Sequence, residues 1–241
     1  MSLLTPSGGL VYHARALVHR RGLWAPFRAA LGRWLSRELP PGDELVLVGP
    51  SAGHCLPLQE LARFPSVLVL EPDPLARRIL RKRLSGVRFQ VEQRDVLLEP
   101  LLSGGVGLDA VLEARPRASV LFCNVLGQLH FGLSEPQQTR FEQQFRQRWL
   151  PLLAGRRWAS FHDRWSLDWG VERSPTPSEL DFEHAPTNDE LGLAWFGPSG
   201  PPLTVLDHRT SQLFPEAWPR RYFGWPITAR ALHVVEGVSG A

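Results

Sequence analysis

The residues of this chain best suited to chemistry stand at the ends of predicted strands. The segment 44–48 is an apolar strand candidate, and a turn with Gly49 and Gly53 follows it. A buried parallel strand that leads through a glycine turn into a helix brings bare backbone close to a nucleotide-like ligand. The second predicted strand ends in Glu71, and an acid there can accept hydrogen bonds from ribose hydroxyls. Together, the turn and the acid predict a ligand with a nucleoside part.

Other polar residues follow the later predicted strands. Asp95 comes after the third strand, Asn124 after the fourth, and His162 and Asp163 at the end of the fifth. The carboxyl ends of parallel strands meet at the ligand-binding edge of an open α/β sheet, so we expect these side chains there. His162 and Asp163 can act as a general base and its orienting partner, and His130 is another candidate base. Each also has a plainer alternative as a turn former, a cap or a structural side chain.

Strand and helix patterns alternate through the middle of the chain. Strands are expected at 44–48, 67–71, 87–92, 118–123 and 157–162, and helices at 55–64, 73–84, 107–114 and 136–153. Alternation of this kind predicts a parallel sheet covered on both faces. Residues 9–39 carry apolar side chains at helical spacing, with a break expected at Gly22.

The pattern changes after Ser166. Residues 167–227 are rich in Pro, Gly and Trp and show no long helical periodicity. Such a segment is either a lid or binding loop, or a packed loop region whose tryptophans fill core. Strands are expected around Val205 and over 229–236, as an antiparallel pair at the end of the sheet.

These elements predict one α/β domain over 1–241. We expect a three-layer sandwich around a mostly parallel, Rossmann-like sheet of about seven strands. Residues 1–40 form an N-terminal helical extension, 41–165 a ligand-binding core, and 166–241 an irregular cap with the final strands.

Composition excludes several classes of protein. The hydrophobic fraction is 43%, the charged fraction is 21% and the net charge is +3, as in ordinary globular proteins. Two cysteines are too few for a disulfide framework, and the histidines lack metal-ligand spacing, so no metal is expected. No apolar run is long enough to cross a membrane, and no signal peptide is recognised, which favours a cytoplasmic location.

Glycine spacing argues against a nicotinamide dinucleotide. That fingerprint requires G-x-G-x-x-G, whereas this chain reads Gly-Pro-Ser-Ala-Gly-His over 49–54, without the third glycine. Pro50 also removes a backbone donor that a diphosphate could use. A NAD-dependent oxidoreductase is therefore the least favoured of three possible functions, and the other two follow below.

The chain resembles the class I S-adenosylmethionine-dependent methyltransferases over roughly residues 40–165. Gly49 and Gly53 match the outer glycines of that family's first motif, and Ser51 replaces the middle one. Glu71, in Leu-Glu-Pro-Asp-Pro, matches the acid at the end of its second strand.

The resemblance extends to two later motifs. Asp95 with Val96 matches the motif after the third strand, and Asn124 stands where the fourth motif ends its strand. It implies S-adenosylmethionine as cofactor, with S-adenosylhomocysteine as product. Gly49, Ser51 and Gly53 would line its methionine side, Glu71 would bind the ribose, and Asp95 with Val96 would bind the adenine. Asn124, His162 and Asp163 would then stand at the reaction end.

The chain departs from this family at Leu47 and Ser51. The family often carries an acid at the first of these positions and glycine at the second. These departures favour, as the alternative, a methyltransferase-fold protein that binds or assembles without catalysis.

The acceptor is expected to be a small molecule. Arginines on the helix 73–84 suit a phosphate-bearing partner, but a solvated helix face explains them as well, so nucleic acid is not favoured. No membrane partner is expected.

Overall fold

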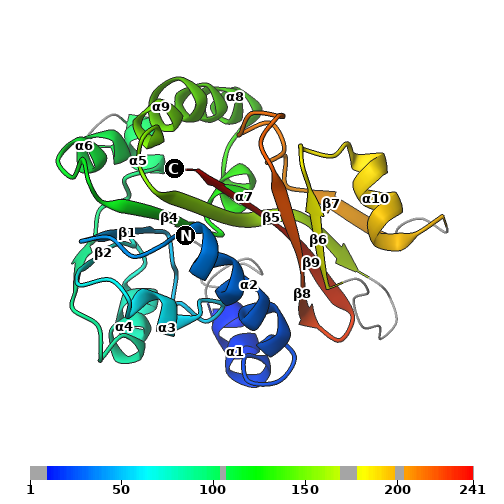
Figure 1. Cartoon of the computed structure of the whole chain (residues 1–241), viewed down its shortest axis with the longest axis horizontal. Helices are drawn as coiled ribbons and strands as arrows, with labels where there is room; N and C mark the ends of the chain where they lie inside the picture. Colours follow the sequence, from blue (N-terminus) through cyan, green and yellow to red (C-terminus); the bar gives the residue numbers. More distant parts are fainter. Residues whose placement is uncertain (1–9, 104–106, 169–177, 199–203, 241) are drawn as a thin grey trace.

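The computed structural model describes residues 10–103, 107–168, 178–198 and 204–240. One twisted sheet crosses the molecule, with helices on both of its faces (Figure 1). Helices α1 to α4 lie on one face and α5 to α9 on the other, which gives the expected three layers.

Five parallel strands form one half of the sheet. They are β1 (Leu45–Val48), β2 (Val67–Leu70), β3 (Phe89–Glu92), β4 (Ser119–Cys123) and β5 (Trp158–Asp168). Their order is β3-β2-β1-β4-β5. The chain therefore adds β2 and β3 on one side of β1 and then β4 and β5 on the other side of β1. Strands β1, β2 and β4 are buried throughout, which is why they read as unbroken apolar runs. The reversal places a switch point, the usual ligand position in such sheets, at the carboxyl ends of β1 and β4.

The other half of the sheet is antiparallel. It comprises β6 (Glu179–Phe182), β7 (Thr204–Asp207), β8 (Arg220–Thr228) and β9 (Ala231–Gly240). Strand β9 lies between β5 and β8 and is antiparallel to both, so β8 runs in the same direction as β5. Among the described residues the sheet has nine strands, which corrects the expectation of about seven. The eleven residues of β5 extend beyond β4, and this extension pairs with β7.

The helices match the sequence patterns unevenly. Their bounds are α1 Leu10–His19, α2 Ala25–Glu38, α3 Leu58–Leu61, α4 Pro74–Arg83, α5 Leu98–Ser103, α6 Leu108–Glu113, α7 Leu126–Leu129, α8 Glu135–Gln144, α9 Leu150–Leu153 and α10 Asn188–Phe196. The expected break at Gly22 separates α1 from α2, and Asp73 caps α4. The helix expected over 136–153 is present as α8 and α9, joined by the π-helical turn Phe145–Trp149. Helices α5 and α7 were not expected.

The region after Ser166 is more regular than predicted. It carries β6, α10, β7 and most of β8. Strands β7 and β9 do not pair with each other, because each pairs with β5 on a different edge. Trp195 and Trp225 are buried, so these two tryptophans fill core, whereas Trp169 lies outside the described residues.

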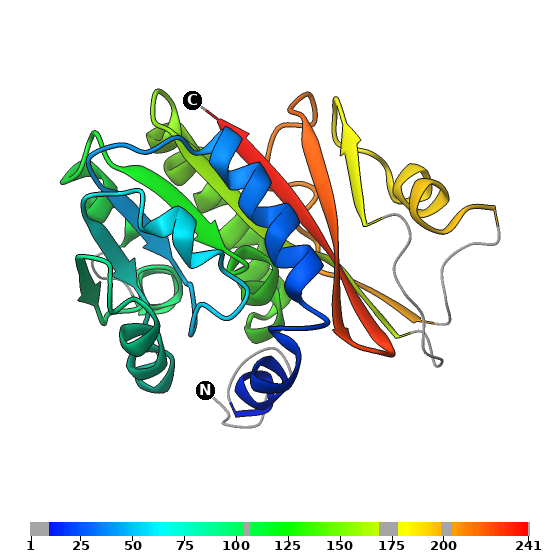
Figure 2. The same cartoon turned by 60° about the horizontal axis from the view of Figure 1, so that its bottom comes forward.

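Helix α1 lies at the carboxyl edge of the parallel strands. Figure 2 shows it beneath that edge, at the opposite end of the sheet from the C-terminus. Among the described residues, no helix has both the length and the apolar character needed to cross a membrane.

Candidate functional site

The glycine turn after β1 is tightly packed against its neighbours. Gly49 has a φ of +61°, and a Cβ there would lie 2.6 Å from the Cβ of Val125. Gly53 has a φ of +65°, and its Cβ would lie 2.8 Å from Cδ1 of Leu80. Both glycines are therefore required by the turn and by the protein's own side chains, whatever ligand binds nearby.

Glu71 joins the ends of β1 and β2. Its Oε2 accepts a hydrogen bond from the Ser51 backbone N–H at 2.7 Å, and its Oε1 accepts one from the Asp73 N–H at 3.0 Å. The residue is 6% exposed and has no ion-pair partner among the described residues. Burial raises the pKa of this carboxyl, against the lowering effect of the two backbone donors. The Arg77 guanidinium also lowers this pKa and donates to the Glu71 backbone carbonyl at 3.0 Å. A buried acid that lacks a direct ion pair at a switch point marks a candidate functional site.

Two residues at the switch point hold an unusual backbone conformation. Ser51, after β1, has a φ of +51°, and Asn124, after β4, has a φ of +54°. Residues other than glycine rarely adopt these φ angles, and the residues that do so cluster at functional sites.

Asp95 and Val96 lie beyond the end of β3. One Asp95 oxygen, Oδ1, accepts hydrogen bonds from the backbone N–H groups of Leu97 and Leu98, at 3.0 and 2.8 Å. This is the turn-forming role that the sequence left open. Val96 is buried, and its carbonyl accepts a hydrogen bond from Leu108 at 2.9 Å.

Asn124, directly after β4, meets Asp163, which lies within β5 just beyond its pairing with β4. The Asn124 Nδ2 donates to Oδ2 of Asp163 at 3.0 Å, and its Oδ1 accepts from the Asp163 backbone N–H at 2.7 Å. Gln128, on α7, donates to the same Oδ2 at 2.5 Å. The sequence therefore placed these two residues at one edge correctly, and Gln128 is an addition.

Asp163 also pairs with a histidine from β9. Nδ1 of His233 lies 3.0 Å from Oδ1 of Asp163, which is fully buried. Burial alone would raise the pKa of Asp163, but His233, His208 and Asn124 outweigh it and lower that pKa to about 2. Asp163 is therefore a carboxylate at neutral pH.

The structure does not bring His162 and Asp163 together. Neighbouring residues of a strand point to opposite faces of the sheet, so the expected pairing of these two side chains was wrong. Nδ1 of His162 lies 2.9 Å from Oγ of Ser160, and its Nε2 lies 3.6 Å from the buried Glu236. His162 is fully buried in this second network. The side chain of His130 lies outside the described part of the structure.

Helix α1 contacts the turn after β1 through a histidine pair. Nδ1 of His13 lies 3.3 Å from Nε2 of His54, and both residues are buried. Burial, together with nearby cations such as Arg83 and Arg28, lowers the pKa of His54 to about 3. Helix α1 therefore covers this turn through neutral imidazoles.

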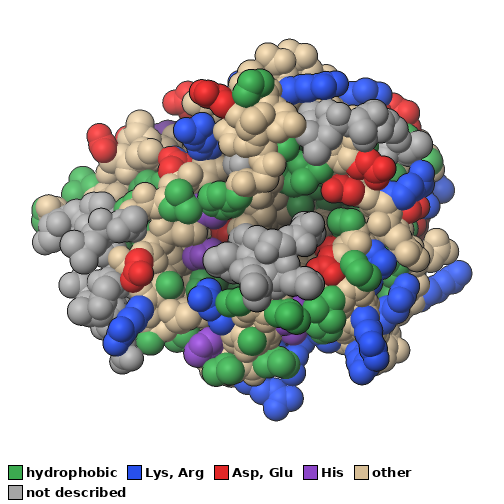
Figure 3. All heavy atoms as spheres, turned by 180° about the vertical axis from the view of Figure 1, so that it is seen from behind, with side chains coloured by type: hydrophobic (Ala, Val, Ile, Leu, Met, Phe, Trp, Pro, Cys, Tyr) green, Lys and Arg blue, Asp and Glu red, His purple; other side chains and the backbone are tan. Residues whose placement is uncertain are grey.

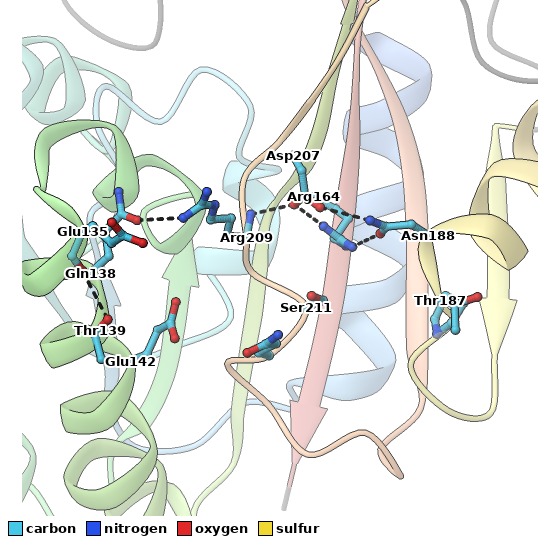
Figure 4. Close-up of a pocket in the computed structure, with 12 residues that line it drawn as sticks. Glu135, Gln138, Thr139, Glu142, Arg164, Thr187, Asn188, Asp207, Arg209 and Ser211 are labelled. Atoms are coloured by element: carbon cyan, nitrogen blue, oxygen red, sulfur yellow. Dashed lines mark hydrogen bonds and ion pairs between the residues drawn. The ribbon is translucent and has the colours of Figure 1, made fainter.

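A polar cavity of about 540 Å³ lies beside the extension of β5. Figure 4 shows Arg164 there, joined to Asp207 and Asn188, with Arg209 reaching Gln138 of α8. Arg164 occupies a β-bulge, a feature that often re-aims side chains near functional sites.

The segment 207–211 separates this cavity from the Asp163 cluster, which comprises Asn124, Gln128, Asp163, His208 and His233. Asp207, Arg209 and Ser211 line the cavity. Between them, His208 bonds the Gly127 carbonyl at 2.8 Å, and Thr210 donates to the Asp163 carbonyl at 3.2 Å. The cavity and the cluster thus share one wall.

The back of the molecule, turned away in Figure 1, carries a surface depression. Figure 3 shows a hollow near the middle of that face, with histidine and acidic side chains reaching the surface close to it. In the part of the chain that the structure describes, no three His, Cys, Asp or Glu side chains are grouped to hold a metal ion.

Sequence reasoning missed His233, His208 and Gln128. His233 and His208 follow no motif, and their approach to Asp163 depends on how β9 and the segment after β7 fold back onto β5. Gln128 lies four residues after Asn124, so helical spacing beyond β4 is the one signal that could have indicated it.

No protein-family model and no curated protein matches this chain. Several solved structures are similar to it at low sequence identity. The N-methyltransferase NodS from Bradyrhizobium japonicum, in complex with S-adenosyl-L-homocysteine, is 12% identical, with 89% of this chain and 87% of that chain covered and a TM-score of 0.44. The glycopeptide N-methyltransferase MtfA, complexed with S-adenosyl-L-methionine, is 14% identical, with 88% and 93% covered and a TM-score of 0.37. The N-terminal domain of EvdMO1 with S-adenosylhomocysteine bound is 12% identical, with 89% and 81% covered and a TM-score of 0.37.

Proposed function

We propose that this protein is an S-adenosylmethionine-dependent methyltransferase with its cofactor at the carboxyl ends of β1, β2 and β3. The observation that supports this most is Glu71, a buried carboxyl that forms no direct ion pair among the described residues and joins two strand ends beside the switch point. A nucleoside ribose offers the hydroxyl donors that such a carboxylate lacks.

The residues around Glu71 are compatible with an adenosyl group. Each Glu71 oxygen accepts one backbone hydrogen bond, and a carboxylate oxygen can accept two, so both retain capacity for a ribose hydroxyl. Oδ1 of Asp95 caps the start of α5, which leaves Oδ2 for an adenine amino group. Gly49, Ser51 and Gly53 would border the methionine part, and Val96 the adenine ring.

The protein's own contribution to methyl transfer is alignment. Bound S-adenosylmethionine would supply a methyl group already activated by its sulfonium. The chain then has to hold the acceptor in line with that methyl group and exclude water. Asn124 and Asp163 border the reaction end, where their mutual hydrogen bonds hold both side chains rigid.

We further propose a small-molecule acceptor. The polar cavity beside Arg164 shares a wall with the Asp163 cluster and has the size of a small-ligand site. In this proposal the cavity holds a polar part of the acceptor that lies away from the reacting atom.

A second candidate is a binding or assembly protein that keeps this fold without catalysis. The side chains of Val125 and Leu80 occupy the space next to Gly49 and Gly53, respectively. Leu47 is a fully buried apolar residue. The same features would suit a turn that has no cofactor to hold.

Calorimetry separates these candidates. We expect saturable binding of S-adenosylmethionine and S-adenosylhomocysteine to the folded protein, and none of NADH. Glu71→Ala should weaken that binding at least tenfold, about 1.4 kcal/mol, because the ribose loses its acceptor. Glu113→Ala, which removes an exposed acid at the end of α6, is the matched control and should bind normally.

Two outcomes of the calorimetry would contradict these expectations. No saturable heat at millimolar cofactor, with circular dichroism showing a folded protein, would remove the methyltransferase proposal. Normal binding by Glu71→Ala would show that the acid has another role.

A further inference from the structure

His233 is the one histidine of the Asp163 cluster with an uncommitted nitrogen. Its Nδ1 faces Asp163 at 3.0 Å, its Nε2 has no hydrogen-bond partner among the described residues, and 21% of its side chain is exposed. By contrast, both nitrogens of the buried His208 are engaged, with the Gly127 carbonyl at 2.8 Å and Oγ of Ser166 at 2.6 Å.

A carboxylate that faces Nδ1 determines where the imidazole proton lies. The negative Asp163 carboxylate, 3.0 Å from Nδ1, favours the tautomer with its proton on Nδ1, which leaves Nε2 as a bare lone pair. Asn124 and Gln128 both donate to the other Asp163 oxygen, so this carboxylate is held in place from two further elements. The same arrangement of orienter and base recurs in unrelated enzymes, where it is recognised by geometry.

We propose that His233 is the general base of this site and that Asp163 is its positioning residue. The inference rests on the proposed function and deepens it, because it names the class of acceptor. A base is needed when the acceptor atom carries a proton that it does not readily lose at neutral pH. The acceptor is therefore an amine or a hydroxyl group, and a thiol, which ionises more easily, would not require this machinery.

The charge balance of the transfer supports this assignment. The acceptor forms a new bond to the methyl carbon while the bond from that carbon to sulfur breaks, and the bonding electrons stay on sulfur. The sulfonium charge thereby passes to the acceptor, and the acceptor becomes neutral again when it releases a proton. His233 Nε2 receives that proton, and the imidazolium formed is stabilised by the Asp163 carboxylate before solvent removes the proton.

The groups around His233 suit this cycle. Asp163 faces it from β5, the His208 ring lies 6.0 Å away on the segment after β7, and the Trp225 ring lies 5.8 Å away on β8. Asp163 supplies the one carboxylate among these groups, and the Trp225 ring supplies an apolar wall. Water is thus limited on one side of the imidazole while the other side stays accessible.

The first test is structural and needs no acceptor. Long-range ¹H–¹⁵N NMR, with His233 assigned by comparison with His233→Gln, should show the Nδ1–H tautomer. That preference should be lost in Asp163→Asn. Diethyl pyrocarbonate should modify His233 in the wild type, as followed by peptide mass spectrometry, and saturating S-adenosylhomocysteine should slow the modification at least fivefold. His184, which is exposed and remote from the cluster, is the control histidine and should react equally with and without it.

The second test uses a panel of simple amines, phenols and thiols with S-adenosylmethionine, and follows release of S-adenosylhomocysteine. We expect turnover of an amine or a phenol. His233→Gln should lower kcat at least 100-fold at pH 7 with an unchanged KM for the cofactor. The deficit should shrink at high pH, where the acceptor loses its proton without help, and His184→Gln should behave as wild type.

The outcomes separate the two proposals. A protein that binds no S-adenosylhomocysteine defeats the proposed function itself. If S-adenosylhomocysteine binds, the Nε2–H tautomer or unshielded His233 overturns the assignment of the base, even where no compound of the panel reacts. Turnover of thiols alone, or a fully active His233→Gln, overturns it as well.

Discussion

Asp163 is the residue on which the buried polar contacts of the site converge. It receives hydrogen bonds from Asn124 and Gln128 and pairs with His233, and its side chain is fully buried. A buried carboxylate is costly unless such partners compensate it, so the cluster has to be assembled as a unit.

This convergence predicts an acid-sensitive contribution to stability. The pKa of Asp163 is lowered from its ordinary 3.8 to about 2, so the folded state favours the charged form. The stabilisation is present above pH 3.8 and is lost as the pH falls through about 2. Asp163→Asn should lower the free energy of unfolding by about 2 kcal/mol at pH 7, and the difference should vanish near the lower pKa. Urea titrations across this range measure it. An equal deficit at all pH values would contradict the electrostatic explanation.

The contribution of His54 to the free energy of unfolding changes over a different pH range. Its pKa is lowered from 6.5 to about 3, so the folded state favours the neutral imidazole under α1. Stability is therefore complete above pH 6.5 and declines as the pH falls toward 3. We expect the melting temperature of the wild type to fall from pH 7 to pH 5, and that of His54→Gln to change less. His184→Gln is the control, and parallel curves for all three proteins would refute the prediction.

Helix α7, which follows β4, packs against the middle of β5. Its Gly127 lies directly against the backbone of Asp163, and a Cβ at that position would be 2.6 Å from the Asp163 carbonyl oxygen. A side chain cannot be accommodated without moving the helix, because the obstacle is main chain.

Gly127→Ala should therefore be strongly destabilising, by roughly 2 kcal/mol or more, as an overpacked core is. Gly132→Ala is the matched control, since a Cβ there meets nothing within 4 Å. Thermal unfolding of the two variants compares them directly. Equal melting temperatures would show that α7 shifts freely.

At this scale the sequence predicted what depends on local pattern. The five parallel strands, the break at Gly22 and the cap at Asp73 follow from apolar runs, a helix breaker and a short polar side chain. The antiparallel half was not predicted, because β6 and β7 are four-residue strands in a Pro- and Gly-rich region. Their partners are set by tertiary pairing, which no local period encodes.

The residues of the candidate site were likewise predictable where they depend on local pattern and not where they depend on tertiary pairing. Glu71 and Asn124 were predicted because they directly follow strands, and strand ends share an edge. Asp163 was expected at the end of its strand, but β5 continues to Asp168, so Asp163 lies within that strand. The partnership of His162 with Asp163 was wrong because strand neighbours alternate between faces. His233 could not be predicted, since its contact with Asp163 requires the register of β9 on β5.

At the scale of the whole molecule, β5 connects two different halves. It closes the parallel sheet on one edge and carries β9 and β7 on the other, so the nucleoside end and the base come from opposite halves. Figure 1 shows the antiparallel strands continuing away from the parallel ones along β5. We therefore expect a cofactor site on the parallel half, with the general base supplied by the antiparallel half.

The most direct measurement is a crystal structure of the protein with S-adenosylhomocysteine. The ribose hydroxyls should lie within hydrogen-bonding distance of the Glu71 carboxylate, and the sulfur should point toward Asn124 and His233. Density for the ligand in the cavity beside Arg164 instead, or a Glu71 carboxylate that contacts only protein when the ligand is bound, would contradict the account.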